Sequence, residues 1–189
     1  YNRLQRDTEA EKYFLKAIQL DSFNINAYNS LGVIYLNTQQ FEKTEATYFK
    51  VLRLDSTHAP AWVNLGDLYD QLNRPKDARQ AFNNALDLDF PYAHPFAHTG
   101  LGNLYLKEGK YSSAEGSFKK AIELNNFYDQ APLSLGKLYL KTEQFKSAKA
   151  SFDKVLELYP EHNEAPVHLA IWSLRTNQPD KAWNYLSDA

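Results

Sequence analysis

The sequence predicts an all-α solenoid built from stacked, antiparallel helix pairs. The first observation is a six-residue motif that recurs along the chain. The second is that apolar residues between its copies recur every three or four positions, as on one face of a helix. An interval of about 34 residues accommodates one pair of short helices and is typical of solenoids. The copies are SLGVIY (30–35), NLGDLY (64–69), GLGNLY (100–105) and SLGKLY (134–139), and successive copies are 34, 36 and 34 residues apart.

Residues 59–92 illustrate how one repeat is built. Trp62, Leu65 and Tyr69 are spaced as on a first helix, and Ala78 and Phe82 are spaced as on a second. The segment DQLNRPKD lies between them, and its asparagine and proline favour a short turn. Each repeat is therefore expected to be a helix, a turn and a second helix.

The glycine of the motif falls in the middle of the first helix. Glycine there costs roughly 1 kcal/mol relative to alanine, so Gly66 and its equivalents predict a close approach of two helices. We expect small residues on the second helix to face the glycine and a large ring four residues later to fill the space beside them. The small residues are Thr44, Ala78, Ala114, Ala148 and Ala182, and the large ones are Tyr48, Phe82, Phe118, Phe152 and Leu186.

The spacing of Trp62, Leu65, Gly66, Tyr69, Ala78 and Phe82 resembles the tetratricopeptide repeat, and the resemblance extends over the whole chain. It implies a right-handed superhelix whose concave face is lined by the first helices and binds a segment of another protein. The predicted domain organisation is a single solenoid over 1–189: a half repeat (1–24), four repeats (25–58, 59–92, 95–128 and 129–162) and a degenerate terminal repeat (163–189).

Residues 93 and 94 are two extra positions between consecutive repeats. The simple interpretation is a lengthened turn, with Pro95 starting the next helix, where a missing N–H is tolerated. The alternative is a zinc site, because His94 and His98 have the i,i+4 spacing of two ligands on one helical face. No acidic residue stands at 95–97, and His58 and His162 also occur at repeat ends. We therefore expect a structural role for His94 and no metal.

Composition excludes several function classes. The net charge of −2 does not favour nucleic acid, and no apolar run is long enough to span a membrane. There is no cysteine, and no glycine-rich phosphate loop or catalytic motif occurs. We therefore expect no catalysis and no cofactor. The tyrosines Tyr35, Tyr69, Tyr105 and Tyr139 follow the repeat spacing and are expected in the core.

The candidate site is the set of first-helix positions that line the concave face in proteins with this repeat. Its mixture of amides and aliphatic groups suits an extended peptide. Lys107, Lys137, Lys141 and Arg175 form a basic stripe, which either complements helix C-termini or receives an acidic segment of the partner. The residues are Asn29, Val33, Asn37, Val63, Asn64, Asp67, Gln71, Thr99, Asn103, Lys107, Leu133, Lys137, Lys141, Val167, His168, Ile171 and Arg175.

The order of the repeats also resembles the bacterial type IV pilus pilotin, a lipoprotein of six such repeats with a lengthened step between its third and fourth repeats. The pair Phe90–Pro91 and the weak final repeat LAIWSLRTNQPDKAW carry this resemblance. It implies a factor that escorts secretin subunits and lies at the periplasmic face of the outer membrane, with its lipid-bearing cysteine upstream. Without it, we expect a cytoplasmic scaffold. Two other possibilities are a substrate-recruiting arm of an enzyme and a self-associating scaffold.

Overall fold

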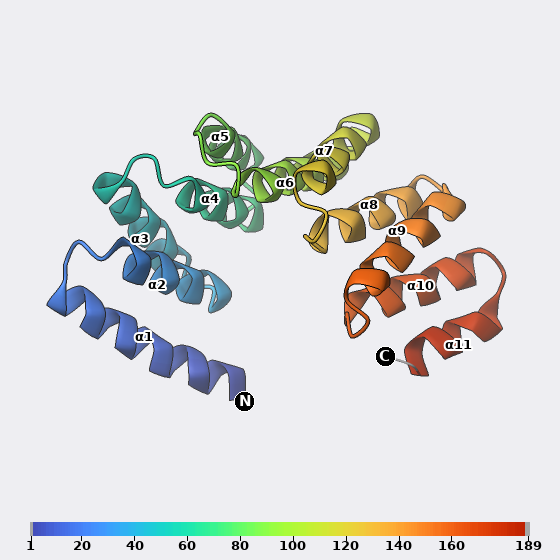
Figure 1. Ribbon diagram of the computed structural model, residues 1–189, viewed down its shortest axis with the longest axis horizontal. Coiled ribbons are helices and arrows are strands. Elements are labelled where there is room, and N and C mark those ends of the chain that lie inside the picture. Colours follow the sequence, from blue (N-terminus) through green and yellow to red (C-terminus); the bar gives the residue numbers. More distant parts are fainter. Residues whose placement is uncertain (1, 188–189) are drawn as a thin grey trace. The chain divides into compact units, whose positions relative to one another are not determined.

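The computed structural model describes residues 2–187, which form eleven α-helices and no strand (Figure 1). The predicted all-α class is therefore confirmed. The helices belong to two compact units, and the boundary lies between Ala93 and His94, at the two extra residues. Unit 1 contains α1 (Asn2–Leu20), α2 (Ile25–Asn37), α3 (Phe41–Leu54), α4 (Ala59–Gln71) and α5 (Pro75–Leu86). Unit 2 contains α6 (His94–Lys107), α7 (Tyr111–Leu124), α8 (Gln130–Lys141), α9 (Phe145–Leu158), α10 (Glu164–Arg175) and α11 (Pro179–Ser187).

Within each unit, consecutive helices run antiparallel and pack against one another (Figure 1). Each predicted repeat contains one helix pair: α2 with α3, α4 with α5, α6 with α7, α8 with α9, and α10 with α11. The predicted half repeat corresponds to α1, which packs against α2. Residues 1 and 188–189, at the ends of the predicted first and last segments, lie outside the described residues. The single solenoid over 1–189 stays a prediction.

A glycine meets an aromatic ring inside each of the four full pairs, as the repeat spacing predicts. A Cβ atom built on Gly66 would lie 2.4 Å from Cε1 of Phe82, far inside ordinary van der Waals contact. The ring of Phe82 is only 1% exposed. Because the ring lies directly on the α4 backbone, the space has no room for a side chain. The same contact joins Gly32 to Tyr48, Gly102 to Phe118 and Gly136 to Phe152.

Hydrogen bonds between tyrosine and glutamate join neighbouring repeats within each unit. The hydroxyl of Tyr69 on α4 donates to Glu45 on α3, and that of Tyr139 on α8 donates to Glu115 on α7, both over 2.8 Å. The rings of these tyrosines are buried as predicted. Tyr105 is only half-buried and packs on the edge of the unit 2 core. The tyrosine position thus serves both the core and the junction between repeats.

The turn inside each helix pair contains one residue with positive φ. Gly109 adopts φ +74°, which is natural for glycine. The other pairs place a residue with a side chain in the same left-handed region, where a Cβ is sterically disfavoured. These residues are Gln39 (φ 58°), Asn73 (φ 55°), Glu143 (φ 59°) and Asn177 (φ 58°).

The junction between the units differs from the expectation by one residue. Helix α6 begins at His94, so Pro95 is its second residue instead of its first. This position still suits proline, because the first four N–H groups of a helix have no intrahelical partner. His94 and His98 therefore share one helix. No group of three or more histidine, aspartate or glutamate side chains arranged for a metal occurs among residues 2–187.

Candidate functional site

The candidate residues lie on the first helix of each pair, and these helices are neighbours within each unit. Helix α2 packs beside α4 in unit 1, and α8 packs beside both α6 and α10 in unit 2. Each unit therefore presents a continuous surface made from its first helices. None of the helices within residues 2–187 has the length and apolar character needed to cross a bilayer.

Three of the candidate positions are not on this surface, which corrects the expectation from the sequence. Val63 is 7% exposed, Thr99 is 4% exposed and Leu133 is fully buried. They share one position of the repeat, and side chains at this position pack between helices. Asn29 occupies the same position on α2 and is half-buried beside Asn64 of α4. The side chain at this position is exposed only on α10, the first helix of the terminal repeat, where Val167 is 44% exposed.

The surface of unit 1 carries polar groups that the fold does not use. Val33, Asn37, Asp67 and Gln71 are all exposed on α2 and α4. Among the described residues, none of these polar side chains has a hydrogen-bond or ion-pair partner. The neighbouring amides of Asn29 and Asn64 are half-buried and approach each other, with Nδ2 of Asn64 3.5 Å from Oδ1 of Asn29. This surface is therefore free to bind other polar groups.

Asp67 has the most strongly altered ionisation on this surface. Desolvation by the surrounding protein and the negative charge of Asp70 raise its pKa to about 7. Its side chain is nevertheless open to water on one side. Solvent screening therefore makes the energetic effect smaller than it would be for an enclosed carboxylate. Tyr48 lies nearby, and burial together with the charge of Asp67 raises the pKa of its hydroxyl.

The basic stripe of unit 2 is largely engaged within the protein. Nζ of Lys137 lies 2.9 Å from Oε2 of Glu164, and this lysine lowers the pKa of Glu164. Lys141 lies over the ring of Tyr111, with Nζ 5.9 Å from the ring centroid. Lys107 and Lys141 are in the last turns of their helices, where a cation complements the helix dipole. The local explanation of the stripe is therefore stronger than the sequence alone suggested.

Arg175 shows most clearly what these cations do. Its guanidinium donates to the carbonyl of Leu140 over 2.6 Å, and it lies 3.3 Å from Oε1 of Glu143. It also covers the ring of Phe145. Arg175 thus joins α10 to the C-terminal end of α8, the first helix of the preceding repeat. Of the remaining candidates, Asn103 and His168 are half-buried and Ile171 is 41% exposed.

His168 is held against the core of unit 2. Its ring stacks on Phe152, with centroids 5.4 Å apart and planes 13° apart. Desolvation, followed by the charge of Lys137, lowers the pKa of His168. The imidazole is therefore biased towards its neutral form. It is half-buried on α10, the last of the first helices of unit 2.

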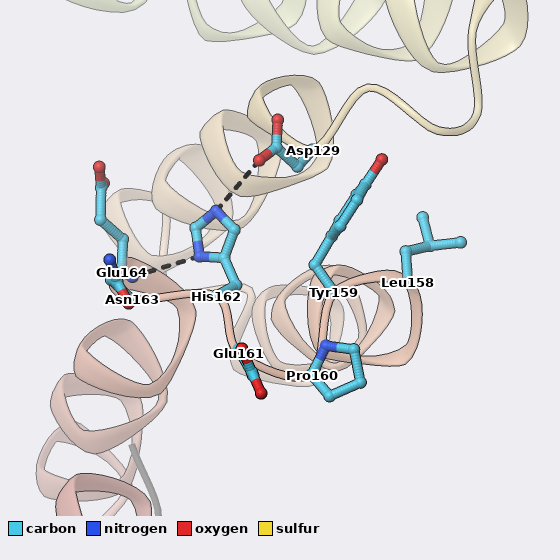
Figure 2. A pocket seen from close by; sticks show the side chains of 8 residues that line it. All are labelled: Asp129, Leu158, Tyr159, Pro160, Glu161, His162, Asn163 and Glu164. Atoms are coloured by element: carbon cyan, nitrogen blue, oxygen red, sulfur yellow. Dashed lines mark hydrogen bonds and ion pairs between the residues drawn. The ribbon is translucent and has the colours of Figure 1, made fainter.

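A cavity of about 640 Å³ lies at the turn between α9 and α10 in unit 2 (Figure 2). His162 is at its centre, where Nδ1 accepts hydrogen bonds from the backbone N–H groups of Glu164 and Ala165 and Nε2 faces Asp129 at 3.4 Å. His58 caps α4 in the same way, accepting from the N–H of Ala61. His58 and His162 thus have structural roles at the starts of helices, and the structural role expected for His94 stays a prediction.

Comparison with known families decides which repeat this is. Three sequence models described as tetratricopeptide repeat match the chain, one at 63–129, one at 13–46, and one at both 1–24 and 133–162. Together these matches cover most of the sequence. The chain is a tetratricopeptide repeat protein. Such proteins are in general non-catalytic scaffolds that bind other proteins or peptides.

Solved structures of tetratricopeptide repeat proteins share the fold at low sequence identity. A chain of the APC/C hetero-tetramer Cut9–Hcn1 matches with a TM-score of 0.86 and 18% identity over 100% of this chain, which spans only 37% of that chain. PilF of Pseudomonas aeruginosa matches with a TM-score of 0.75 and 21% identity over 98% of this chain and 83% of its own. PilW, a type IV pilus biogenesis factor, matches with a TM-score of 0.80 and 21% identity over 98% of this chain and 85% of its own.

One residue of interest is missed by sequence reasoning because it looks like an ordinary core position of the repeat. Tyr48 occupies the ring position that is phenylalanine in the next three repeats, and the repeat pattern treats it as an equivalent ring. Its hydroxyl is buried and has no hydrogen-bond partner within the part of the chain that the structure describes. The only signal in the sequence is the single oxygen atom that distinguishes Tyr48 from Phe82, Phe118 and Phe152.

Proposed function

We propose that this tetratricopeptide repeat protein is a non-catalytic scaffold that binds a segment of another protein along its first helices and so supports assembly of a complex. The observation that carries the proposal is the unit 1 surface, where exposed amide, carboxylate and aliphatic groups lie together without internal partners. Such side chains suit an extended peptide, because amides can pair with its backbone and aliphatic groups can contact its side chains. The second helices supply the packing that holds this surface in place.

A displayed library of random heptapeptides tests the proposal without knowledge of the natural partner. The chain is expected to enrich a family of related sequences. Reversal of the two lysines on α8, Lys137→Glu with Lys141→Glu, tests whether the unit 2 stripe takes part. The matched control is Lys146→Glu with Lys154→Glu on α9. Like the α8 pair, it combines one ion-paired lysine with one that has no ion pair among the described residues. Loss of peptides only in the α8 variant supports a role for the stripe, and equal capture by both variants removes the stripe from the site.

The more specific proposal is a pilotin-like factor in type IV pilus assembly, with secretin subunits as partner and the periplasmic face of the outer membrane as location. PilF and PilW support it, because each aligns with 98% of this chain and over most of its own length. Mass spectrometry of the N-terminus of the native full-length protein tests it. An acylated cysteine after a cleaved signal supports the proposal, and an unprocessed cytosolic start contradicts it.

The competing proposal is a substrate-recruiting arm of an enzyme. The Cut9–Hcn1 match supports it, because the aligned segment there is 37% of a longer chain. The full open reading frame distinguishes the two proposals: a catalytic domain beside the repeats favours the enzyme. Self-association is a separate possibility, which sedimentation at increasing protein concentration tests.

A further inference from the structure

Unit 1 contains a carboxylate that the fold leaves without a counter-ion. Asp67 lies exposed on α4, and no basic side chain among the described residues pairs with it. Its charged neighbour is another acid, Asp70, whose charge opposes ionisation of Asp67. Some acids elsewhere on the helices are paired, for example Glu115 with Lys119 at 2.7 Å and Asp153 with a lysine at 2.6 Å. The part of the chain that the structure describes therefore supplies no cation to balance the charge of Asp67.

A second polar group lies buried behind this carboxylate. Tyr48 of α3 is fully buried, and its ring crosses the backbone of α2 at Gly32. Among the described residues its hydroxyl has no hydrogen-bond partner, although buried polar groups in folded proteins are almost always paired. The hydroxyl is close enough to α4 for the charge of Asp67 to act on it. The site thus holds one unpaired carboxylate and one unpaired hydroxyl.

The other repeats show that neither group is needed to build the fold. The equivalents of Tyr48 are phenylalanine in the next three repeats, and those rings pack on the same glycine. The equivalents of Asp67 have no common chemistry, so packing does not require an acid there. Both departures occur at the junction between α3 and α4. The residues equivalent to Asp67 are Val33, Asn103, Lys137 and Ile171.

We propose that Asp67, backed by the Tyr48 hydroxyl and flanked by Asn64, binds the cationic group of a basic side chain on the protein segment that unit 1 recognises. This inference rests on the proposed function and specifies its chemistry. A cation beside Asp67 supplies the missing counter-charge and offsets the repulsion from Asp70. A guanidinium suits the site best, because some of its N–H donors can reach the carboxylate while others meet the amide oxygen of Asn64. The site therefore determines the position of an arginine or lysine in the bound segment.

Selection from the displayed heptapeptide library tests this inference with three proteins: wild type, Asp67→Asn and Asp153→Asn. Asp67→Asn keeps the shape of the side chain and removes its charge. Asp153→Asn is the matched control, because it removes an exposed carboxylate from the second helix α9. We expect wild type and the control to enrich arginine or lysine at one peptide position at least fivefold. Asp67→Asn should still select peptides but without that enrichment.

A synthetic peptide from the wild-type selection gives the quantitative test. Replacing its basic residue by a neutral isostere, citrulline for arginine or norleucine for lysine, should weaken binding to wild type at least tenfold and binding to Asp67→Asn less than twofold. Equal enrichment of basic residues by all three proteins, or peptides without a preferred basic position, would overturn the inference and leave the proposed function intact. Failure of all three to select any peptide would overturn both.

Discussion

Replacing Gly66 by alanine tests the packing that defines the repeat. The added Cβ would lie 2.4 Å from Cε1 of Phe82, 2.6 Å from Cδ1 and 2.7 Å from Cζ. To reach normal contact, the ring would have to retreat by about 1 Å. Phe82 is fully enclosed by neighbouring side chains, so this movement displaces other core atoms. Overpacking of this kind costs about 1–3 kcal/mol.

The same substitution also brings a gain that must be separated from this cost. Alanine favours a helix over glycine by about 1 kcal/mol. The overpacking cost of about 1–3 kcal/mol exceeds the helix-propensity gain of about 1 kcal/mol. We therefore expect Gly66→Ala to lower the free energy of unfolding by about 1 kcal/mol. Gly116 on α7 is the control, because it is exposed and a Cβ there meets no atom within 4 Å. Gly116→Ala should raise stability by up to about 1 kcal/mol.

Urea denaturation followed by circular dichroism measures both variants against wild type. The decisive quantity is the difference between the two alanine variants. Gly66→Ala with Phe82→Leu should be less destabilised than the sum of the single changes, because the smaller side chain makes room. The terminal repeat already has this combination, with Ala170 and Leu186 at the equivalent positions. If Gly66→Ala stabilised the protein as much as Gly116→Ala, the packing argument would be refuted.

Four further predictions concern stability, and denaturant titration measures each of them. Tyr139→Phe should lower stability by about 1 kcal/mol, because it removes the bond to Glu115 between repeats; no change would show that this bond contributes nothing. Tyr48→Phe should raise stability by about 1 kcal/mol by removing an unpaired buried hydroxyl; a loss would mean that the hydroxyl is paired in solution. Gln39→Gly should raise stability by about 1 kcal/mol, because φ is 58° there, whereas a decrease would contradict this view of the turn. The pKa of Asp67 is about 7 in the folded protein and 3.8 ordinarily, so the folded state binds this proton more tightly than the unfolded state does. The free energy of unfolding should therefore fall as the pH rises from about 4 to about 7. Asp67→Asn should remove this part of the pH dependence, and an unchanged profile would argue against the raised pKa.

The helix pairs and their internal contacts are predictable because the repeats align the sequence with itself. Four copies place glycine, small residue and ring at constant separations, and only stacking of paired helices satisfies all three. The spacing of Gly66 and Phe82 therefore assigns them to one contact. Buried Thr44 also fits the pattern, because its hydroxyl donates to the carbonyl of Gln40 one turn earlier.

Contacts between repeats are harder to predict, because they depend on residues that the repeat pattern leaves free to vary. Lys137 meets Glu164 and Arg175 meets Leu140 across 27 and 35 residues. No periodic signal marks these pairs, so the sequence makes the basic stripe look more available than it is. Val63 and Leu133 are wrongly assigned to the surface for a related reason: the amount of exposed area at their position depends on how closely neighbouring helices pack.

The central claim is that the first helices bind a protein segment. The most direct test is an NMR titration of the isotope-labelled chain with a peptide selected from the heptapeptide library. Our account predicts that the largest amide shift changes lie on first helices, on α2 and α4 in unit 1 or on α6, α8 and α10 in unit 2. Largest changes on the second helices α3, α5, α7 or α9 would contradict it.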